Sequence, residues 1–252
     1  MEITLEMYLI VCPMIFLASM IDAIGGGGGL ISLPAYMLAG LPYPLAAGSN
    51  KLSSSIGSLT ATITYFKKGK LLVLPALFAV LGALPGSYLG AELLKLTNEN
   101  MVRIMMIALM PIVALFIVFK GNKLPKPKPV TKKMLFLCFI SGLVVGAYDG
   151  FFGPGAGTFY ILFFTWLCGM EMVNASGSAK PVNFASNIGA LVSHLINGRI
   201  LFALALPAMA FSVLGGYIGS RLAILRGTKL IRFAMLAVVG GIMVKLIVEW
   251  FL

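Results

Sequence analysis

Charged side chains are scarce in this chain of 252 residues, since only 11% of them are Asp, Glu, Lys or Arg, whereas 60% are hydrophobic. A soluble domain carries about 25% charged residues, so this composition excludes an ordinary water-soluble fold. Segments 71–91, 134–148 and 200–220 carry no charge, and 101–119 carries only Arg103. A bilayer span needs roughly 20 apolar residues. The sequence therefore predicts an all-α polytopic membrane protein.

Cysteine and histidine are also rare. Cys12, Cys138 and Cys168 lie far apart within apolar runs, and His194 is the single histidine. Their spacing indicates neither a metal site nor a disulfide framework. The chain also lacks a Gly-Lys-Ser/Thr motif and a nucleophile–histidine–acid set at helical spacing. We therefore expect no cofactor, no metal and no enzyme activity.

Acidic residues are few, with 8 Asp and Glu against 19 Lys and Arg. Most basic residues lie in three short segments, namely 67–70, the Lys/Pro-rich segment 120–133 and 221–232. Such clusters mark the cytoplasmic side of a membrane protein, so the excess charge does not indicate a nucleic-acid partner. The pattern predicts a multi-pass protein of the cytoplasmic (inner) membrane with both termini outside.

The linker 120–133 divides the chain into two similar parts, 1–119 and 134–252. Short motifs recur in the same order and at a near-constant offset in both parts. They are "AGSNK" with "SGSAK", "GSYLG" with "GGYIG", and "GGGGG" with "GPGAG". The basic segments make 71–91 run outward and its counterpart 200–220 run inward. We therefore predict two inverted repeats, an arrangement typical of secondary transporters.

The same topology constrains the two glycine-rich stretches. Residues 3–40 must begin and end on the outer side, and residues 134–170 on the inner side. Each segment then holds a helix, a glycine break and a returning helix of about a dozen residues, which spans only ~18 Å. Each repeat is thus predicted to be a Gly-broken helical hairpin plus three transmembrane helices.

A polar stripe follows one face of the helix expected after each hairpin. The spacing of these side chains places them on a single helical face. Such a face can form hydrogen bonds between helices or line a substrate route, and the lysines favour the route because a charge inside the bilayer is costly. The two stripes are Lys51, Ser54, Ser58 and Tyr65 in the first part and Lys180, Asn183, Asn187 and His194 in the second.

Lysine, hydroxyl and amide donors suit a small anion. Ser49 and Ser178 precede the lysines, and Pro181 disfavours helical geometry at Lys180, so we expect a helix to begin or break there. Backbone N–H groups at a helix start attract anions. The backbone of Gly27 and Gly155 is expected to approach the same anion, because glycine has no Cβ.

Acidic side chains stand beside both glycine breaks, Asp22 at the first and Asp149 at the second. Three roles are open for them: taking up protons, pairing with Lys51 and Lys180, or capping the broken helices. His194 and Tyr65 are further candidates for a proton relay.

These features together resemble the TauE/SafE family of sulfite exporters and related anion permeases. The resemblance rests on "GGGGGLISLP", "GPGAGTFYI", "LAAGSNKLSSSIGSLTATITYFKKGK" and "ASGSAKPVNFASNIGALVSHLINGRI", and it covers nearly the whole chain. The second glycine stretch departs from it, with Pro154 and Ala156 where more glycine is typical. The resemblance implies transport of small sulfur-containing anions, such as sulfite or organosulfonates, across the cytoplasmic membrane.

The expected function is alternating-access transport of a small anion, directed outward because an inside-negative potential favours anion export. An anion channel and a proton-coupled importer of a sulfur-containing anion are the alternatives, and a membrane-embedded enzyme or an assembly subunit are more distant ones. The expected partners are a small anion and the lipid bilayer, and a homo-oligomer is compatible with them.

Overall fold

The computed structural model describes residues 3–93 and 129–251, and every regular element within these ranges is a helix. The predicted all-α fold is confirmed. The expected span 101–119 and most of the linker 120–133 lie outside the described residues. The helices are α1 (Leu5–Gly25), α2 (Gly29–Leu38), α3 (Tyr43–Lys67), α4 (Val73–Leu93), α6 (Lys132–Phe151), α7 (Ala156–Trp166), α8 (Met172–Ile196) and α9 (Phe202–Phe251).

Four of the described helices are long and apolar enough to cross a bilayer. They are Leu5–Gly25, Val73–Leu93, Lys132–Phe151 and Phe202–Val238. The more polar helices α3 and α8 pack against each other, and α4 and α9 cover them. The polar stripes therefore face protein rather than lipid, as the cost of exposing polar groups to hydrocarbon requires.

Both glycine breaks are present. The residue after α1, Gly26, has φ 81°, and Gly153 and Gly155 between α6 and α7 have φ 95° and 83°. Only glycine adopts this left-handed region at little cost. The returning helices α2 and α7 contain 10 and 11 residues, too few to span the hydrocarbon core.

The expected helix start at Lys180 is wrong. Helix α8 begins at Met172 and continues through Pro181, so Lys180 lies well inside it. A proline within a membrane helix removes one backbone hydrogen bond, a loss that neighbouring helices can compensate. The local bias of the residue before proline is weaker than the packing that keeps α8 helical on both sides of Pro181.

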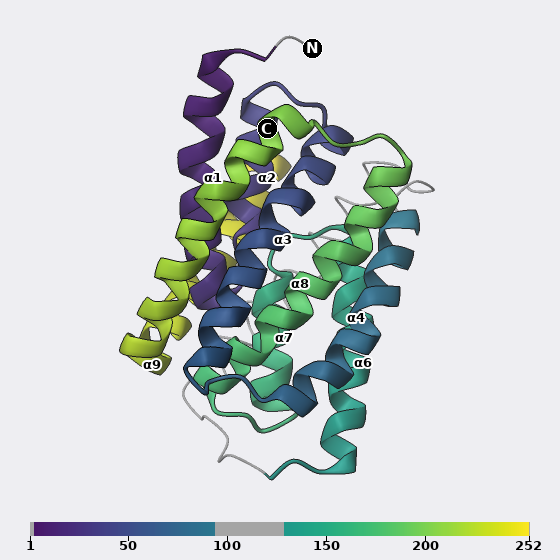
Figure 1. Ribbon diagram of the computed structural model, residues 1–252, viewed down its shortest axis with the longest axis vertical. Coiled ribbons are helices and arrows are strands. Elements are labelled where there is room, and N and C mark those ends of the chain that lie inside the picture. Colours follow the sequence, from purple (N-terminus) through teal and green to yellow (C-terminus); the bar gives the residue numbers. More distant parts are fainter. Residues whose placement is uncertain (1–2, 94–128, 252) are drawn as a thin grey trace.

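Figure 1 shows at which end of the molecule each helix begins and ends. The start of α1 and the end of α9 lie at one end of the molecule, here called the termini end. The α3–α4 connection, the start of α6 and the bend of α9 lie at the opposite end, here called the basic end because the α3–α4 connection brings Lys67, Lys68 and Lys70 there. The end that faces the cytoplasm stays a prediction.

Helix α9 is two helices joined at Gly227, whose backbone is not helical (φ 63°, ψ −151°). The part before Gly227 runs from the termini end to the basic end, whereas α4 runs the other way (Figure 1). Opposite directions in corresponding elements are what an inverted repeat requires. The repeat itself stays a prediction.

Backbones approach closely where α4 packs against α6. A Cβ added at Gly142 would lie 2.0 Å from the Ala79 carbonyl oxygen, and one at Gly86 would lie 2.4 Å from the Leu143 carbonyl oxygen. Small residues allow this approach, and close packing is a main source of helix association in lipid.

We expect Gly142→Ala to destabilise the protein by about 1–3 kcal/mol, because overpacking forces the backbones apart. Gly240→Ala is the matched control, since a Cβ there meets nothing within 4 Å. Thermal unfolding in detergent measures both variants. A Gly142→Ala protein as stable as the control would contradict the close α4–α6 packing.

Candidate functional site

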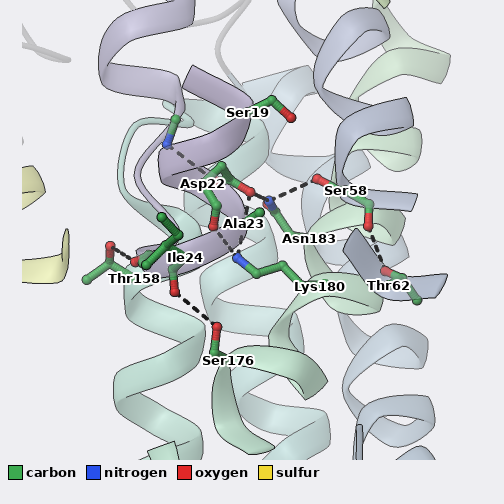
Figure 2. A network of polar contacts seen from close by, with 12 residues as sticks. Ser19, Asp22, Ala23, Ile24, Ser58, Thr62, Thr158, Ser176, Lys180 and Asn183 are labelled. Carbon is green, nitrogen blue, oxygen red and sulfur yellow. Dashed lines mark hydrogen bonds and ion pairs between the residues drawn. The ribbon is translucent and has the colours of Figure 1, made fainter. Parts of the chain in front are cut away.

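Two buried ion pairs connect the halves of the chain. The Lys51 Nζ lies 2.9 Å from the Asp149 Oδ1, and it also donates a hydrogen bond to the Asp149 carbonyl oxygen (3.0 Å). The Lys180 Nζ lies 3.8 Å from the Asp22 Oδ2 and donates to the Asp22 carbonyl oxygen (Figure 2). Each lysine thus pairs with the acidic residue of the opposite half. Pairing with the lysines is present in the structure, and the Asp22 Oδ1 also accepts a hydrogen bond from the Gly28 N–H (3.3 Å) at the start of α2, as a capping carboxylate would.

A polar cavity of about 500 Å³, here called the chamber, lies between these pairs. Both glycine breaks and both polar stripes contribute to its wall. Its polar lining side chains are Ser19, Asp22, Ser32, Asn50, Lys51, Ser54, Ser58, Asp149, Asn183, Asn187 and Ser212, and the glycines are Gly26, Gly28, Gly29, Gly153, Gly155 and Gly157.

Hydrogen bonds join the two stripes across the chamber wall. The Asn187 Oδ1 accepts from the Lys51 Nζ (3.2 Å). The Asn183 Nδ2 donates to the Asp22 Oδ2 (3.1 Å) and to the Ser58 Oγ (3.3 Å), as Figure 2 shows. The sequence left two roles open for the polar stripes, hydrogen bonding between helices and lining a substrate route. The stripes do form hydrogen bonds between the helices, and they also line the chamber.

The two glycine breaks touch each other. The Gly26 carbonyl oxygen accepts from the Thr158 N–H (2.9 Å), and the Gly25 carbonyl oxygen accepts from the Thr158 hydroxyl (2.7 Å). A Cβ at Gly26 would lie 2.1 Å from the Gly157 carbonyl carbon. Glycine is required here because two backbones meet with no room for a side chain.

Ser49 and Ser178 do not line the chamber. The Ser49 Oγ accepts from the Leu201 N–H (2.9 Å), and the Ser178 Oγ accepts from the Leu72 N–H (3.0 Å). Leu201 precedes α9 and Leu72 precedes α4. These serines therefore accept hydrogen bonds from backbone N–H groups at the starts of two helices. Such N–H groups have no partner within their own helix and need one elsewhere.

Gly27 also lies away from the chamber, and a Cβ there would meet the Val238 side chain at 2.2 Å. Lys180 stands behind the chamber wall and is fully buried, whereas Lys51 is part of the wall. Gly155 lines the chamber as expected.

Tyr65 and His194 stand beyond the two lysines, at opposite ends of the site. The Tyr65 hydroxyl donates to the Ala23 carbonyl oxygen (3.1 Å) and lies 3.0 Å from the Ser176 Oγ. His194 borders a second cavity of about 320 Å³, to which Lys51 and Asp149 also contribute. Neither Tyr65 nor His194 lines the chamber.

Sequence reasoning missed several functional candidates. Ser186 donates a hydrogen bond to the Asp149 Oδ2, and Asn50 and Ser19 line the chamber. Ser19 precedes Asp22 by one helical turn, and this spacing was a usable signal. The N-termini that reach the chamber are those of α2 and α7, at Gly29 and Ala156, and not those of α3 and α8.

Within residues 3–93 and 129–251, no three His, Cys, Asp or Glu side chains lie close enough together to hold a metal ion. The Cys138 and Cys168 sulfurs lie 3.4 Å apart in the core near the basic end and away from the chamber. The described part of the site therefore offers donors for an anion and two carboxylates that already have cationic partners.

The ion pair of Lys51 and Asp149 should contribute to the free energy of unfolding. We expect Lys51→Met alone to cost about 3–5 kcal/mol, because it leaves a buried carboxylate without its cation. The double variant Lys51→Met/Asp149→Leu is expected to recover much of that loss. Denaturant unfolding in detergent measures this mutant cycle, and additive losses would show that the two side chains are not coupled.

Comparisons with known proteins agree with the sequence resemblance. The model of the family described as "Sulfite exporter TauE/SafE" matches residues 11–246. The probable membrane transporter protein YfcA of Escherichia coli K12 is 36% identical over 231 residues, which cover 90% of this chain and 84% of that protein. A probable membrane transporter protein of Haemophilus influenzae is 34% identical over 236 residues, or 92% of this chain and 91% of that protein. YunE of Bacillus subtilis, also a probable membrane transporter, is 26% identical over 250 residues, or 90% and 92% of the two chains. The chain therefore belongs to the TauE/SafE family and is a multi-pass membrane transporter.

Proposed function

We propose that this transporter moves small anions, namely sulfur oxyanions such as sulfite or an organosulfonate, outward across the cytoplasmic membrane. The observation that carries the proposal is the chamber between the two cross-half ion pairs, with Lys51 in its wall. Transport would proceed by alternating access, with the two halves as inverted repeats and both termini outside.

The donors around the chamber favour an anion over a cation. The Lys51 ammonium, the Asn183 and Asn187 amides and the Ser54 and Ser58 hydroxyls all reach its wall. The N-termini of α2 and α7 add the positive ends of two helix dipoles.

The two carboxylates in the wall do not outweigh these donors. Asp149 is paired with Lys51 and Asp22 with Lys180, so the four charges sum to zero. An anion that enters the chamber therefore meets no net negative charge.

Family membership supports a sulfur-containing substrate, since the matching family is described as "Sulfite exporter TauE/SafE". The chamber has room for a few water molecules, and so for a small pyramidal oxyanion such as sulfite.

The membrane potential supports outward transport of an anion. Moving one negative charge out of an inside-negative cell gains about 2.3 kcal/mol per 100 mV. Export of a free anion therefore needs no coupled ion, whereas import needs one.

Proton-coupled import of a sulfur-containing anion is the second candidate, and one observation favours it. The Asp22 side chain is 19% exposed and lines the chamber, whereas that of Asp149 is 4% exposed. Asp22 is thus the carboxylate best placed to exchange a proton with a bound anion, and Tyr65 and His194 are candidates for passing it on.

Counterflow in proteoliposomes tests the proposal. Liposomes preloaded with sulfite or sulfoacetate should take up the same labelled anion with saturable kinetics. Flux that does not saturate would indicate an anion channel, and absence of uptake for every sulfur oxyanion would refute the substrate assignment.

We expect Lys51→Ala to reduce the initial rate of counterflow about ten- to hundredfold, because a charge-assisted hydrogen bond contributes about 1.5–3 kcal/mol. Lys229→Ala is the matched control, since Lys229 is an exposed lysine on α9. Equal rates in the two variants would exclude Lys51 from the substrate site.

A further inference from the structure

We propose that the two cross-half ion pairs are the gates of the transport path, and that the anion opens each gate by replacing the aspartate on its lysine. This inference rests on the proposed anion transport. It assigns Lys51–Asp149 to the termini end and Lys180–Asp22 to the basic end.

The first gate is a single layer of side chains. Lys51, Asp149 and Asn50 border both the chamber and the second cavity of about 320 Å³. The second cavity also includes Tyr43, the first residue of α3, so it lies toward the termini end. Separating the Lys51–Asp149 pair would join the chamber to this cavity.

The second gate lies deeper in packed protein. Lys180 is fully buried, and the Ser176 hydroxyl beyond it donates to the Ile24 carbonyl oxygen (3.1 Å; Figure 2). Tyr65 fills the next layer through its bond to the Ala23 carbonyl oxygen. Both ion pairs are formed in the structure, and a cavity lies next to the Lys51–Asp149 pair, so we assign the thinner barrier to the termini end.

An ion pair is suited to gating by an anion. Opening an empty gate would leave a buried lysine without a counter-charge, and that is costly. An oxyanion brings the same charge and the same acceptor oxygens as the carboxylate, so it can take the place of Asp149 on Lys51. The released Asp149 carboxylate then keeps its hydrogen bond from the Ser186 hydroxyl and faces the second cavity, which it borders. The gate can therefore open when an anion is bound. Without an anion it stays closed, so other solutes do not leak through.

Each lysine also restrains the hairpin elbow next to it. Lys51 and Lys180 donate to the carbonyl oxygens of Asp149 and Asp22, which lie in the last turn of α6 and α1. Replacing the carboxylate would therefore loosen the contact between a long helix and the glycine break of the other half. This links anion binding to movement of the elbow.

Thiol labelling without any anion tests the gates directly. In a chain without native cysteines, Ser54→Cys reports on the chamber and Ala47→Cys on the second cavity. A membrane-impermeant thiol reagent is added to oriented vesicles from either side.

We expect Asp149→Asn to speed labelling of the Ser54→Cys reporter about tenfold or more from the termini side only. Asp22→Asn should do the same from the basic side only. A tenfold change corresponds to about 1.4 kcal/mol in the opening equilibrium. The Ala47→Cys reporter should be labelled from the termini side at the same rate in both variants.

Exchanging the charges controls for misfolding. The variant Lys51→Asp/Asp149→Lys keeps the ion pair, so chamber labelling should return to the slow rate of the parent. An exchanged variant that labels as fast as Asp149→Asn, or aspartate variants that affect both sides equally, would overturn the gate assignment.

Competition between aspartate and anion is tested with sulfoacetate. Asp149→Asn should lower the KM for sulfoacetate counterflow about fivefold or more, because Lys51 no longer has a competing carboxylate, whereas a purely structural role predicts an unchanged or higher KM. Glu171→Gln, at an exposed carboxylate, should leave KM unchanged. If the wild-type chain does not exchange sulfoacetate, the proposed function fails for this anion, whereas the labelling experiments still decide the gates.

Discussion

The need to neutralise buried lysines organises this structure. A charge inside the bilayer must face an opposite charge or water, and Lys51 and Lys180 both lie inside long helices in the middle of the protein. Their counter-charges come from the ends of α6 and α1, which belong to the other half of the chain. Neither half can satisfy its own lysine, so the two halves must be held together for either to be stable.

The same requirement explains the position of the glycine breaks. Each lysine contacts both the carboxylate and the carbonyl oxygen of its aspartate, and this is possible only near a helix end. Helix α1 ends at Gly25 and α6 at Phe151, within one turn of Asp22 and Asp149. The glycines then allow the chain to turn and the two breaks to touch through Gly26 and Gly157.

The helices, the glycine breaks and the polar stripes could be predicted from the sequence, because each of these follows from local composition and periodicity. Sequence reasoning could not choose the partner of each lysine, because that choice depends on how the halves face each other. Ser49 and Ser178 were misassigned for a related reason, since a buried serine beside a lysine looks the same whether it binds a ligand or caps a neighbouring helix. Pro181 shows the limit of local rules most directly, as α8 passes through it.

The two halves differ where a transporter with two unequal faces needs them to differ. The proposed repeat pairs Tyr65, near the basic end, with His194, near the termini end, and a cavity bordered by His194 lies next to the Lys51–Asp149 pair. The Asp22 side chain, held by Lys180 and Asn183, is 19% exposed, whereas the Asp149 side chain, held by Lys51 and Ser186, is 4% exposed. A perfectly two-fold structure would have gates of equal strength and no resting preference. In the proposed gating, a few side-chain differences around the same lysine–aspartate chemistry would give the two ends different barriers.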